Sequence, residues 1–206
     1  METTLYLLRH GKTPANLENR FAGRTGEALH PEGIEQLQAM GYKLKDFPCA
    51  KIITGPLPRT RQSGEILQSI LAAPLKTDDR LNEIYIPHWD GLTKDEIRNR
   101  FGRQYPDWLE THHYFYVPGF ETIDDVQKRA VDAIESLLDS HRGCHLVVVS
   151  HLIVLRSLLL YYQDLEISQF RSIKIDNGSL TILHRDPTGK ITVEQQIGLE
   201  GIVGEA

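Results

Sequence analysis

The chain has 206 residues, of which 40% are hydrophobic, and this is enough for a single domain over residues 1–206 with a substantial core. Its net charge is -5 and it has no basic block, so it lacks the electrostatic features that a nucleic-acid or anionic-membrane partner would require. No apolar run approaches the ~20 residues of a membrane span, and the first residues are not basic. We therefore expect no membrane segment and no signal peptide, and we expect the protein in the cytoplasm.

The first predicted element is a short buried strand at residues 3–8, and it ends directly at Arg9, His10 and Gly11. Ligands of open α/β sheets bind outside the carboxyl ends of the strands, so an arginine and a histidine at this position indicate a site. Arginine suits phosphate or carboxylate, and histidine suits nucleophilic or acid–base work near neutral pH. The plain alternative is a strand that ends in two solvated polar residues.

Helices and short strands are predicted to alternate along the rest of the chain. The predicted helices occupy residues 31–44, 59–71, 93–101, 122–141 and 153–162. The predicted strands occupy residues 51–54, 145–150, 171–175, 180–184 and 191–197, with Asn177-Gly178 as a hairpin turn. This order indicates a three-layer α/β/α sandwich with a mainly parallel central sheet and an antiparallel C-terminal hairpin.

Basic residues and histidines follow three of the predicted strands. The first strand delivers Arg9 and His10, the second opens into a loop that contains Arg59, and a third ends at His151. If these strands are parallel neighbours, these side chains meet at one edge of the sheet. Like charges repel there and lower the pKa of the histidines, and a bound anion relieves the repulsion. A phosphoryl group is the natural candidate, because its transfer requires mainly charge neutralisation.

Four motifs stand in order along the chain. They are LLRHGKT at residues 7–13, TGPLPRTRQS at 54–63, LNEIYIPHWDG at 81–91 and VVVSH at 147–151. Together they resemble the histidine phosphatase superfamily, the phosphoglycerate-mutase-like proteins, from about residue 3 to the Asn177-Gly178 turn. Four ordered motifs are far more specific than the Arg-His-Gly triplet alone.

The resemblance implies a two-step phosphoryl transfer in which His10 is the nucleophile and becomes a phosphohistidine. Arg9 and Arg59 would hold the phosphoryl oxygens, and His151 would donate to them. Glu83 would protonate the leaving alkoxide and then activate water. No cofactor or metal is expected, because the arginines carry the charge and no motif with metal-ligand spacing is present. Without the resemblance, the plainer interpretation is that Glu83 is a solvated carboxylate on a loop and that His151 is a histidine of the core.

Further substrate contacts are expected around the nucleophile. Thr13 and Asn16 either cap a turn or contact the phosphate, and Arg24 is a candidate for binding a second anionic group. Leu152 stands where the family usually has glycine, so we expect it to narrow the pocket floor or to shift His151. The expected binding residues are Arg9, Thr13, Asn16, Phe21, Gly23, Arg24, Arg59 and Leu152.

An insertion at about residues 87–120 is expected to form a lid over the site. It is rich in rings, which either grip an organic leaving group and exclude water or pack the lid onto the body. These residues are Trp89, Trp108, His112, His113, Tyr114, Phe115 and Tyr116.

The function expected from these features is a metal-independent phosphomonoesterase acting on a small phosphorylated metabolite. One alternative is a bisphosphoglycerate-dependent phosphoglycerate mutase, for which the chain is short. The other is a catalytically silent phosphate-binding or regulatory subunit, which the departure at Leu152 suggests. Sugar phosphates, phosphoglycolate-like acids, phosphoserine and α-ribazole phosphate all remain open as substrates. Ile167, Phe170 and Ile173 serve either a homodimer or the core face of the last strand.

Overall fold

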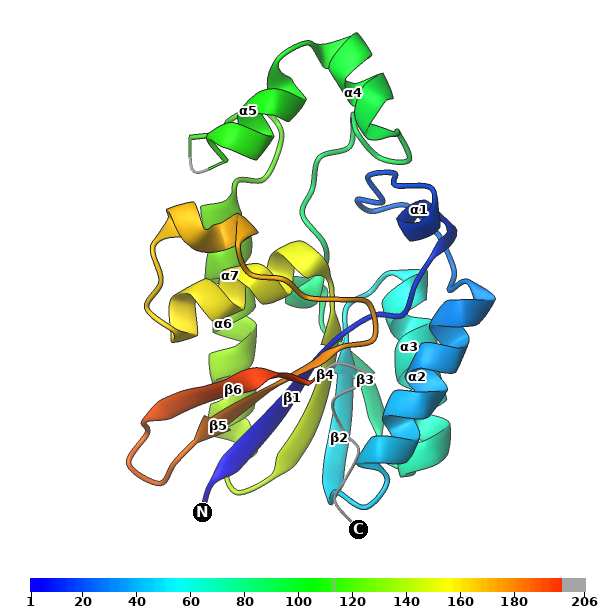
Figure 1. Cartoon of the computed structure of the whole chain (residues 1–206). Coiled ribbons are helices and arrows are strands. Elements are labelled where there is room, and N and C mark those ends of the chain that lie inside the picture. Colours follow the sequence, from blue (N-terminus) through cyan, green and yellow to red (C-terminus); the bar gives the residue numbers. More distant parts are fainter. Residues whose placement is uncertain (113, 198–206) are drawn as a thin grey trace.

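The computed structural model describes residues 1–112 and 114–197 (Figure 1). The strands are β1 (Thr3–Arg9), β2 (Cys49–Thr54), β3 (Leu75–Thr77), β4 (His145–Ser150), β5 (Leu180–Arg185) and β6 (Ile191–Ile197). In this described part they form a six-stranded sheet in the order β3-β2-β4-β1-β5-β6. The first four strands of this order are parallel, whereas β5 runs antiparallel to β1 and β6 antiparallel to β5.

Helices cover both faces of the sheet. They are α1 (Pro14–Leu17), α2 (Pro31–Leu44), α3 (Pro58–Leu71), α4 (Lys94–Phe101), α5 (Gln104–Glu110), α6 (Ile123–Ser140) and α7 (Leu152–Tyr162), with 3₁₀ turns η1 (Asp79–Leu81) and η2 (Ile167–Arg171). The pair α2 and α3 lies on one face and the pair α6 and α7 on the other (Figure 1). The predicted three-layer sandwich with its mainly parallel sheet is therefore confirmed.

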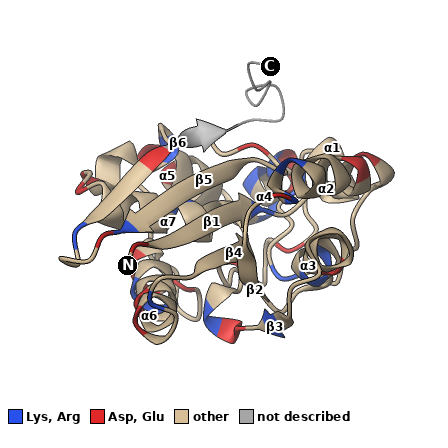
Figure 2. Ribbon diagram, turned by 90° about the horizontal axis from the view of Figure 1, so that it is seen from below, with Lys and Arg blue, Asp and Glu red and all other residues tan. Residues whose placement is uncertain are grey.

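The central strand β4 shows why the sheet is covered on both sides. Val147 and Val149 belong to the core under α2 and α3, whereas Leu146 and Val148 belong to the core under α6 and α7. All four side chains are at most 1% exposed. A strand that is buried on both faces needs apolar residues at every position, which explains its continuous apolar run. Seen from below, the charged residues gather at strand ends and on helices (Figure 2).

The predicted strand at residues 171–175 is wrong. Residues 167–171 form the 3₁₀ turn η2, and the chain then runs irregularly to β5. The antiparallel hairpin is present, but it joins β5 to β6 through the turn at Asp186. The Asn177-Gly178 segment instead bonds to the end of β1, because Gly178 N donates to the carbonyls of Arg9 and His10 at 3.1 and 3.3 Å. Short α1, β3 and α5 were not predicted.

Of the apolar residues near the predicted last strand, Phe170 is fully buried in the core beside α7. Ile167 and Ile173 are partly buried and pack against the same core. The core role therefore holds for these residues, although they do not lie on a strand. A homodimer stays a prediction.

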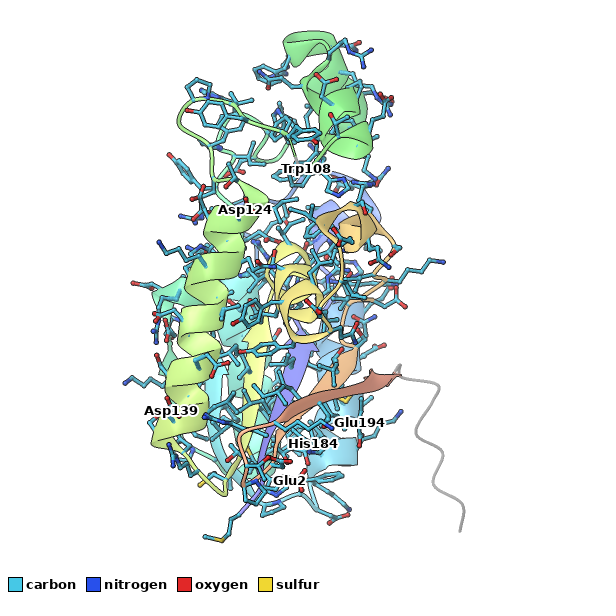
Figure 3. The ribbon with its side chains drawn as sticks, turned by 90° about the vertical axis from the view of Figure 1, so that its left-hand side faces the viewer. Glu2, Trp108, Asp124, Asp139, His184 and Glu194 are labelled. Carbon is cyan, nitrogen blue, oxygen red and sulfur yellow. The ribbon has the colours of Figure 1, made fainter. Side chains whose placement is uncertain are left out.

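The lid helices α4 and α5 stand beyond the carboxyl ends of the parallel strands (Figure 1). Trp89 is fully buried there and contacts five rings of the described residues, with centroid distances of 5.3 to 6.2 Å. Trp108 lies between the lid and the body (Figure 3) and contacts Phe170 at 6.4 Å. Packing of the lid onto the body is thus confirmed for these tryptophans. Tyr114 and Tyr116 are 81% and 70% exposed, and His113 lies outside the described residues.

Replacement of Leu67 by alanine should destabilise the protein by about 2–5 kcal/mol, because it leaves a cavity in the core under α3. The Leu67 side chain is fully buried between α3 and the sheet. Urea unfolding measures this change in the free energy of unfolding. The matched control Glu65→Ala, on the exposed side of the same helix, should stay within about 0.5 kcal/mol of the wild type. Equal effects of the two variants would contradict this packing.

None of the helices in residues 1–112 and 114–197 combines the length and the apolar character that crossing a bilayer would need.

Candidate active site

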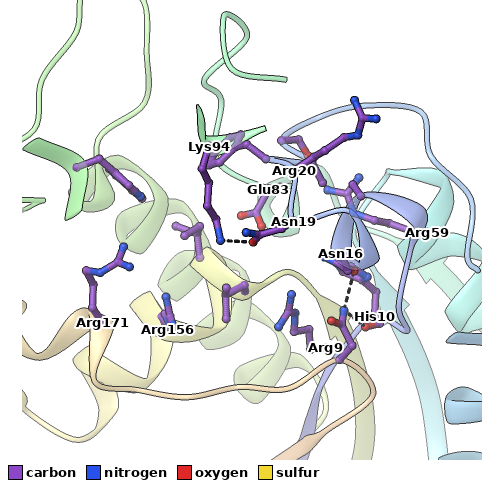
Figure 4. A pocket seen from close by; sticks show the side chains of 18 of the residues that line it. Arg9, His10, Asn16, Asn19, Arg20, Arg59, Glu83, Lys94, Arg156 and Arg171 are labelled. Carbon is purple, nitrogen blue, oxygen red and sulfur yellow. Dashed lines mark hydrogen bonds between the residues drawn. The ribbon is translucent and has the colours of Figure 1, made fainter. Parts of the chain in front are cut away.

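A cavity of about 370 Å³ opens at the carboxyl ends of the parallel strands, below the lid (Figure 4). It is walled by the end of β1, the loop after it, the start of α3, the lid, α7 and η2. The predicted site residues that line it are Arg9, His10, Asn16, Phe21, Gly23, Arg59, Glu83 and Leu152. The structure therefore brings together most of the residues that the sequence indicated, from segments far apart in the chain.

His10 is only 3% exposed, and its ring is held in one tautomer. Its Nδ1 lies 2.7 Å from the carbonyl oxygen of Gly11. A carbonyl only accepts hydrogen bonds, so Nδ1 carries the proton and Nε2 keeps its lone pair. Burial lowers the pKa of His10 well below 6.5, and Arg59 and Arg9 lower it further. The ring is thus neutral at physiological pH, as a nucleophilic imidazole must be.

The segment after His10 is locked by close backbone packing. A Cβ atom on Gly11 would collide with the carbonyl oxygen of Gly33 and with the side chain of Leu37, so only glycine fits there. From the other side, the side-chain Nδ2 of Asn177 donates to the carbonyl of His10 at 3.1 Å and to Asn16 Oδ1 at 3.1 Å. These contacts fix the position of the His10 backbone before any ligand binds.

His151 follows β4 and is fully buried beside His10, with ring centroids 5.3 Å apart. Within the described residues, neither of its ring nitrogens has a hydrogen-bond partner. Burial lowers the pKa of His151 well below 6.5, and Arg59 and His10 add to this effect. A Cβ atom on Gly55 would lie 3.2 Å from its Nε2, so this glycine leaves room for the ring. His151 is therefore a buried, neutral neighbour of His10 with free hydrogen-bonding capacity.

Arg9 and Arg59 are held partly by backbone carbonyls. Arg9 Nη1 donates to Ile175 O at 2.6 Å, and Arg59 donates to Gly23 O at 2.5 Å and to Thr25 O at 3.2 Å. The Nε atoms of both arginines are buried without a partner among the described residues. Burial lowers the pKa of Arg9 to about 10, so it stays charged at neutral pH. Both guanidinium groups thus retain donors for an anion beside His10.

Glu83 is 8% exposed and lies in the same cavity. Burial raises the pKa of its carboxyl above 4.5, although the amide of Ile84, at 2.9 Å from Oε1, and the two arginines oppose this effect. Its backbone carbonyl is held by Arg24 at 2.8 Å and by Arg129 at 3.2 Å. Glu83 is therefore a rigidly placed carboxyl that keeps its proton to higher pH than an exposed glutamate does.

Two predicted contacts lie away from the cavity. Arg24 pairs with Glu121 at 2.9 Å and stacks over the ring of Tyr85 at 5.0 Å. Its guanidinium is thus used to position the loop that carries Glu83, and the prediction that it binds a second anion is not supported by its place. Thr13 donates from its amide and its hydroxyl to Asn16 Oδ1, at 3.0 and 3.3 Å, so it caps the start of α1.

Four basic side chains in the cavity were missed. They are Arg20, Lys94, Arg156 and Arg171. The position of Arg156 in the cavity was predictable, since it follows Leu152 and Ile153 at helical spacing and shares their face of α7. The position of Arg171 in the cavity was not predictable, because the sequence pattern predicted a strand at this residue.

The stability of the folded protein is expected to fall as the pH drops below about 6.5. The pKa of both His10 and His151 is lowered on folding, so the unfolded chain binds more protons in this window. Each histidine then costs up to about 1.4 kcal/mol per pH unit. The raised pKa of Glu83 acts in the opposite direction, because its contribution is lost as the pH rises, and it offsets one histidine in part.

Urea unfolding over a pH series measures this slope. The double variant His10→Asn with His151→Asn should lose most of it. A wild-type stability that stays constant through the histidine range would contradict the neutral, buried state of both rings.

In the described part of the chain, no group of three or more His, Cys, Asp or Glu side chains is placed to hold a metal ion.

Comparison with known proteins identifies the family to which this arrangement of residues belongs. The model of the histidine phosphatase superfamily (branch 1) matches residues 5–197. Phosphoserine phosphatase 1 of Hydrogenobacter thermophilus is 24% identical over 193 residues, which cover 94% of this chain and 92% of that protein. The probable phosphoglycerate mutase GpmB of Escherichia coli is 29% identical over 182 residues, covering 86% and 82%.

Among solved structures, Bacillus stearothermophilus YhfR is 31% identical with a TM-score of 0.89, and the match covers 98% of each chain. The chain spans about half, 54%, of the length of its curated relatives from Mycobacterium tuberculosis. The family model nevertheless covers nearly the whole of this chain, and the fold agrees throughout with a relative of similar length. The chain belongs to the histidine phosphatase superfamily (branch 1).

Proposed function

We propose that this protein is a metal-independent phosphatase that hydrolyses a small phosphorylated metabolite through a phosphohistidine at His10. The observation that carries the proposal is the state of His10. Its ring is buried and neutral, its Nδ1 proton is engaged by Gly11 O, and Arg9 and Arg59 flank it with free donors. This is the state that a histidine nucleophile for phosphoryl transfer requires.

In the first step, His10 Nε2 attacks the phosphorus and the bond from phosphorus to the ester oxygen breaks. Glu83 gives its proton to the leaving alkoxide, which departs as an alcohol. In the second step, Glu83 takes a proton from water, the oxygen of which attacks the phosphorus. The bond between phosphorus and nitrogen breaks, inorganic phosphate leaves, and His10 and Glu83 return to their starting states.

Charge stabilisation in both steps falls to the basic groups around the phosphoryl oxygens. Arg9 and Arg59 carry full positive charge, and the neutral ring of His151 has one N–H free to donate a hydrogen bond as negative charge builds up. These groups can take the electrostatic role that a metal ion has in other phosphatases, which supports a metal-independent reaction. The cavity of about 370 Å³ suits a small substrate.

The names of two relatives favour different outcomes of the same intermediate. Phosphoserine phosphatase 1 favours hydrolysis, whereas GpmB favours a phosphoglycerate mutase. A mutase returns the phosphoryl group to a second hydroxyl and must keep water away from the phosphohistidine. We place hydrolysis first, and a mutase is the second candidate.

Phosphate release from a panel of small phosphomonoesters, with EDTA present, tests the proposal. Turnover without metal would support it, and the best substrate would define the leaving group. Turnover only after metal is added would contradict metal independence. Isomerisation of phosphoglycerate that depends on bisphosphoglycerate, with little phosphate release, would establish the mutase instead. If the pure protein binds phosphate but transfers none, the silent binding subunit is the correct reading.

A further inference from the structure

Glu83 lies on a segment that has no regular structure of its own. It follows η1 and belongs to neither a helix nor a strand. The chain leaves the body here for the lid, and it returns at Glu121, close to the start of α6 (Figure 1). Loops move more than the elements that they connect, yet an acid must stay within about 0.5 Å of its productive position. The backbone of Glu83 therefore needs support from outside this segment.

This support comes from Arg129 on α6. Its Nη1 donates to the carbonyls of Arg80 and Asn82 at 2.7 and 2.6 Å, and its Nη2 donates to the carbonyl of Glu83 at 3.2 Å. The same guanidinium forms a bidentate pair with Glu121, with Nε 2.9 Å from Oε1 and Nη2 3.0 Å from Oε2. A guanidinium has five N–H donors, and these five bonds use all of them. Arg129 thus has no donor left for a substrate.

Glu121 joins Arg129 to a second arginine. Its Oε2 accepts from Arg24 Nη2 at 2.9 Å, while Arg24 Nε donates to the carbonyl of Glu83 at 2.8 Å. The Glu83 carbonyl therefore accepts from two guanidinium groups that share one carboxylate. The side chains of Glu121 and Arg129 are 22% and 18% exposed, so water screens their pair less than it screens a surface pair. We call Arg24, Glu121 and Arg129 the acid-positioning network.

The same network closes the base of the lid. The amide of Tyr85 donates to Glu121 Oε2 at 2.8 Å, and the amide of Glu121 donates to the carbonyl of Tyr85 at 2.9 Å. These bonds join the two ends of the lid segment directly beside Glu83. The apolar face of α6 is buried in the core of the domain. The backbone of Glu83 is thus anchored to the body of the protein through α6 rather than through the lid helices.

The fixed backbone also fixes the carboxyl group of Glu83. Its Oε1 accepts from the amide of Ile84 at 2.9 Å, and Ile84 is fully buried in the core. None of the three network residues is among the described residues that line the cavity. Arg129 and Glu121 therefore influence the reaction through Glu83, and not by contact with the substrate.

We propose that Arg129 and Glu121 are positioning residues of the reaction, which hold the backbone of Glu83 so that its carboxyl meets the leaving-group oxygen. The inference rests on the proposed function, in which Glu83 protonates the leaving alkoxide. Loss of the network leaves the carboxyl present but shifts it. A misplacement of about 1 Å can cost about 10²-fold in rate. This cost should fall on esters whose leaving group needs the proton.

The test uses two variants and two esters. Arg129→Lys keeps the positive charge near Glu83, but its three donors on one nitrogen cannot serve Glu121 and the three carbonyls together. Glu121→Gln keeps the size of the side chain and removes the charge that pairs with both arginines. The esters are an alkyl phosphate, whose leaving group needs a proton, and nitrophenyl phosphate, whose leaving group does not. Lys128→Gln, at an exposed position next to Arg129 on α6, is the control.

Each variant, with its folding checked by circular dichroism, should lower kcat/KM for the alkyl ester by about 10- to 100-fold and leave that for nitrophenyl phosphate nearly unchanged. In a Glu83→Gln background neither substitution should lower the alkyl rate further, because the acid on which they act is already absent. Lys128→Gln should match the wild type with both esters. Equal losses for both esters, or the same loss in the Glu83→Gln background, would overturn the inference while the phosphatase stands.

A measurement without turnover separates this inference from the proposed function. Burial raises the pKa of the Glu83 carboxyl above 4.5, so its titration reports whether the carboxyl stays in the cavity. NMR of labelled glutamate follows this titration, and Glu83→Gln identifies the signal. In Arg129→Lys the charge remains but the backbone is released, and the pKa should fall toward 4.5. That fall would support the positioning role in a protein that hydrolyses no ester, whereas an unchanged pKa would overturn it.

Discussion

His10→Ala is expected to abolish phosphate release, with a fall in kcat of about 10⁴-fold or more. The variant removes the lone pair that attacks phosphorus, and Arg9 and Arg59 cannot replace it because both are protonated at neutral pH. Water that enters the space left by the ring would be a poor substitute, since neutral water is a much weaker nucleophile than imidazole. The rate of phosphate release measures the loss.

A covalent readout makes this prediction specific. Wild-type protein quenched at alkaline pH during turnover should carry one phosphoryl group on His10, detected by mass spectrometry, and His10→Ala should carry none. The control His88→Ala changes an exposed histidine outside the cavity and should retain activity and labelling. Residual turnover of His10→Ala at the wild-type rate, or a phosphoryl group on another residue, would refute the assignment of the nucleophile.

Glu83→Gln should lower kcat by about 10²–10⁴-fold for an alkyl phosphate ester. An alkoxide is a poor leaving group, and glutamine has no acidic proton to give it. The loss should be much smaller for nitrophenyl phosphate in the first step, because nitrophenolate leaves as a stable anion. Kinetics with both esters, for the wild type and the variant, measure this difference. The control Glu65→Gln alters an exposed carboxylate on α3 and should leave both rates unchanged.

The pH profile offers a second readout for Glu83. Burial raises the pKa of its carboxyl, so the acid form persists to higher pH than usual, and activity should fall as the pH rises through that pKa. This basic limb should disappear in Glu83→Gln. Equal losses of kcat/KM, which reports the first step, for alkyl and aryl esters would show that Glu83 does not protonate the leaving group.

The positions of the strands were predictable because their signals are local. β1 and β4 are continuous apolar runs that end in polar residues, and any strand buried on both faces has this pattern. The site followed from the same signal, since His10 and His151 stand directly after these strands and parallel neighbours end at one edge of the sheet. Polar and apolar residues also alternate in the segment at residues 171–175, but its backbone does not pair with a strand of the sheet. A local sequence pattern does not show which distant segment a backbone will pair with.

The sequence by itself determined the layered fold, and it indicated the proposed nucleophile, the two arginines beside it and the candidate acid, because each belongs to a strand end or a compact motif. The tertiary structure decided which cations face the cavity. Arg24 is turned to Glu121, whereas Lys94, Arg156 and Arg171 line the cavity and form no ion pair among the described residues. The physical reason is that the partner of a charged side chain depends on which distant segments fold beside it. The free energy of the charged group also depends on how far these segments bury it.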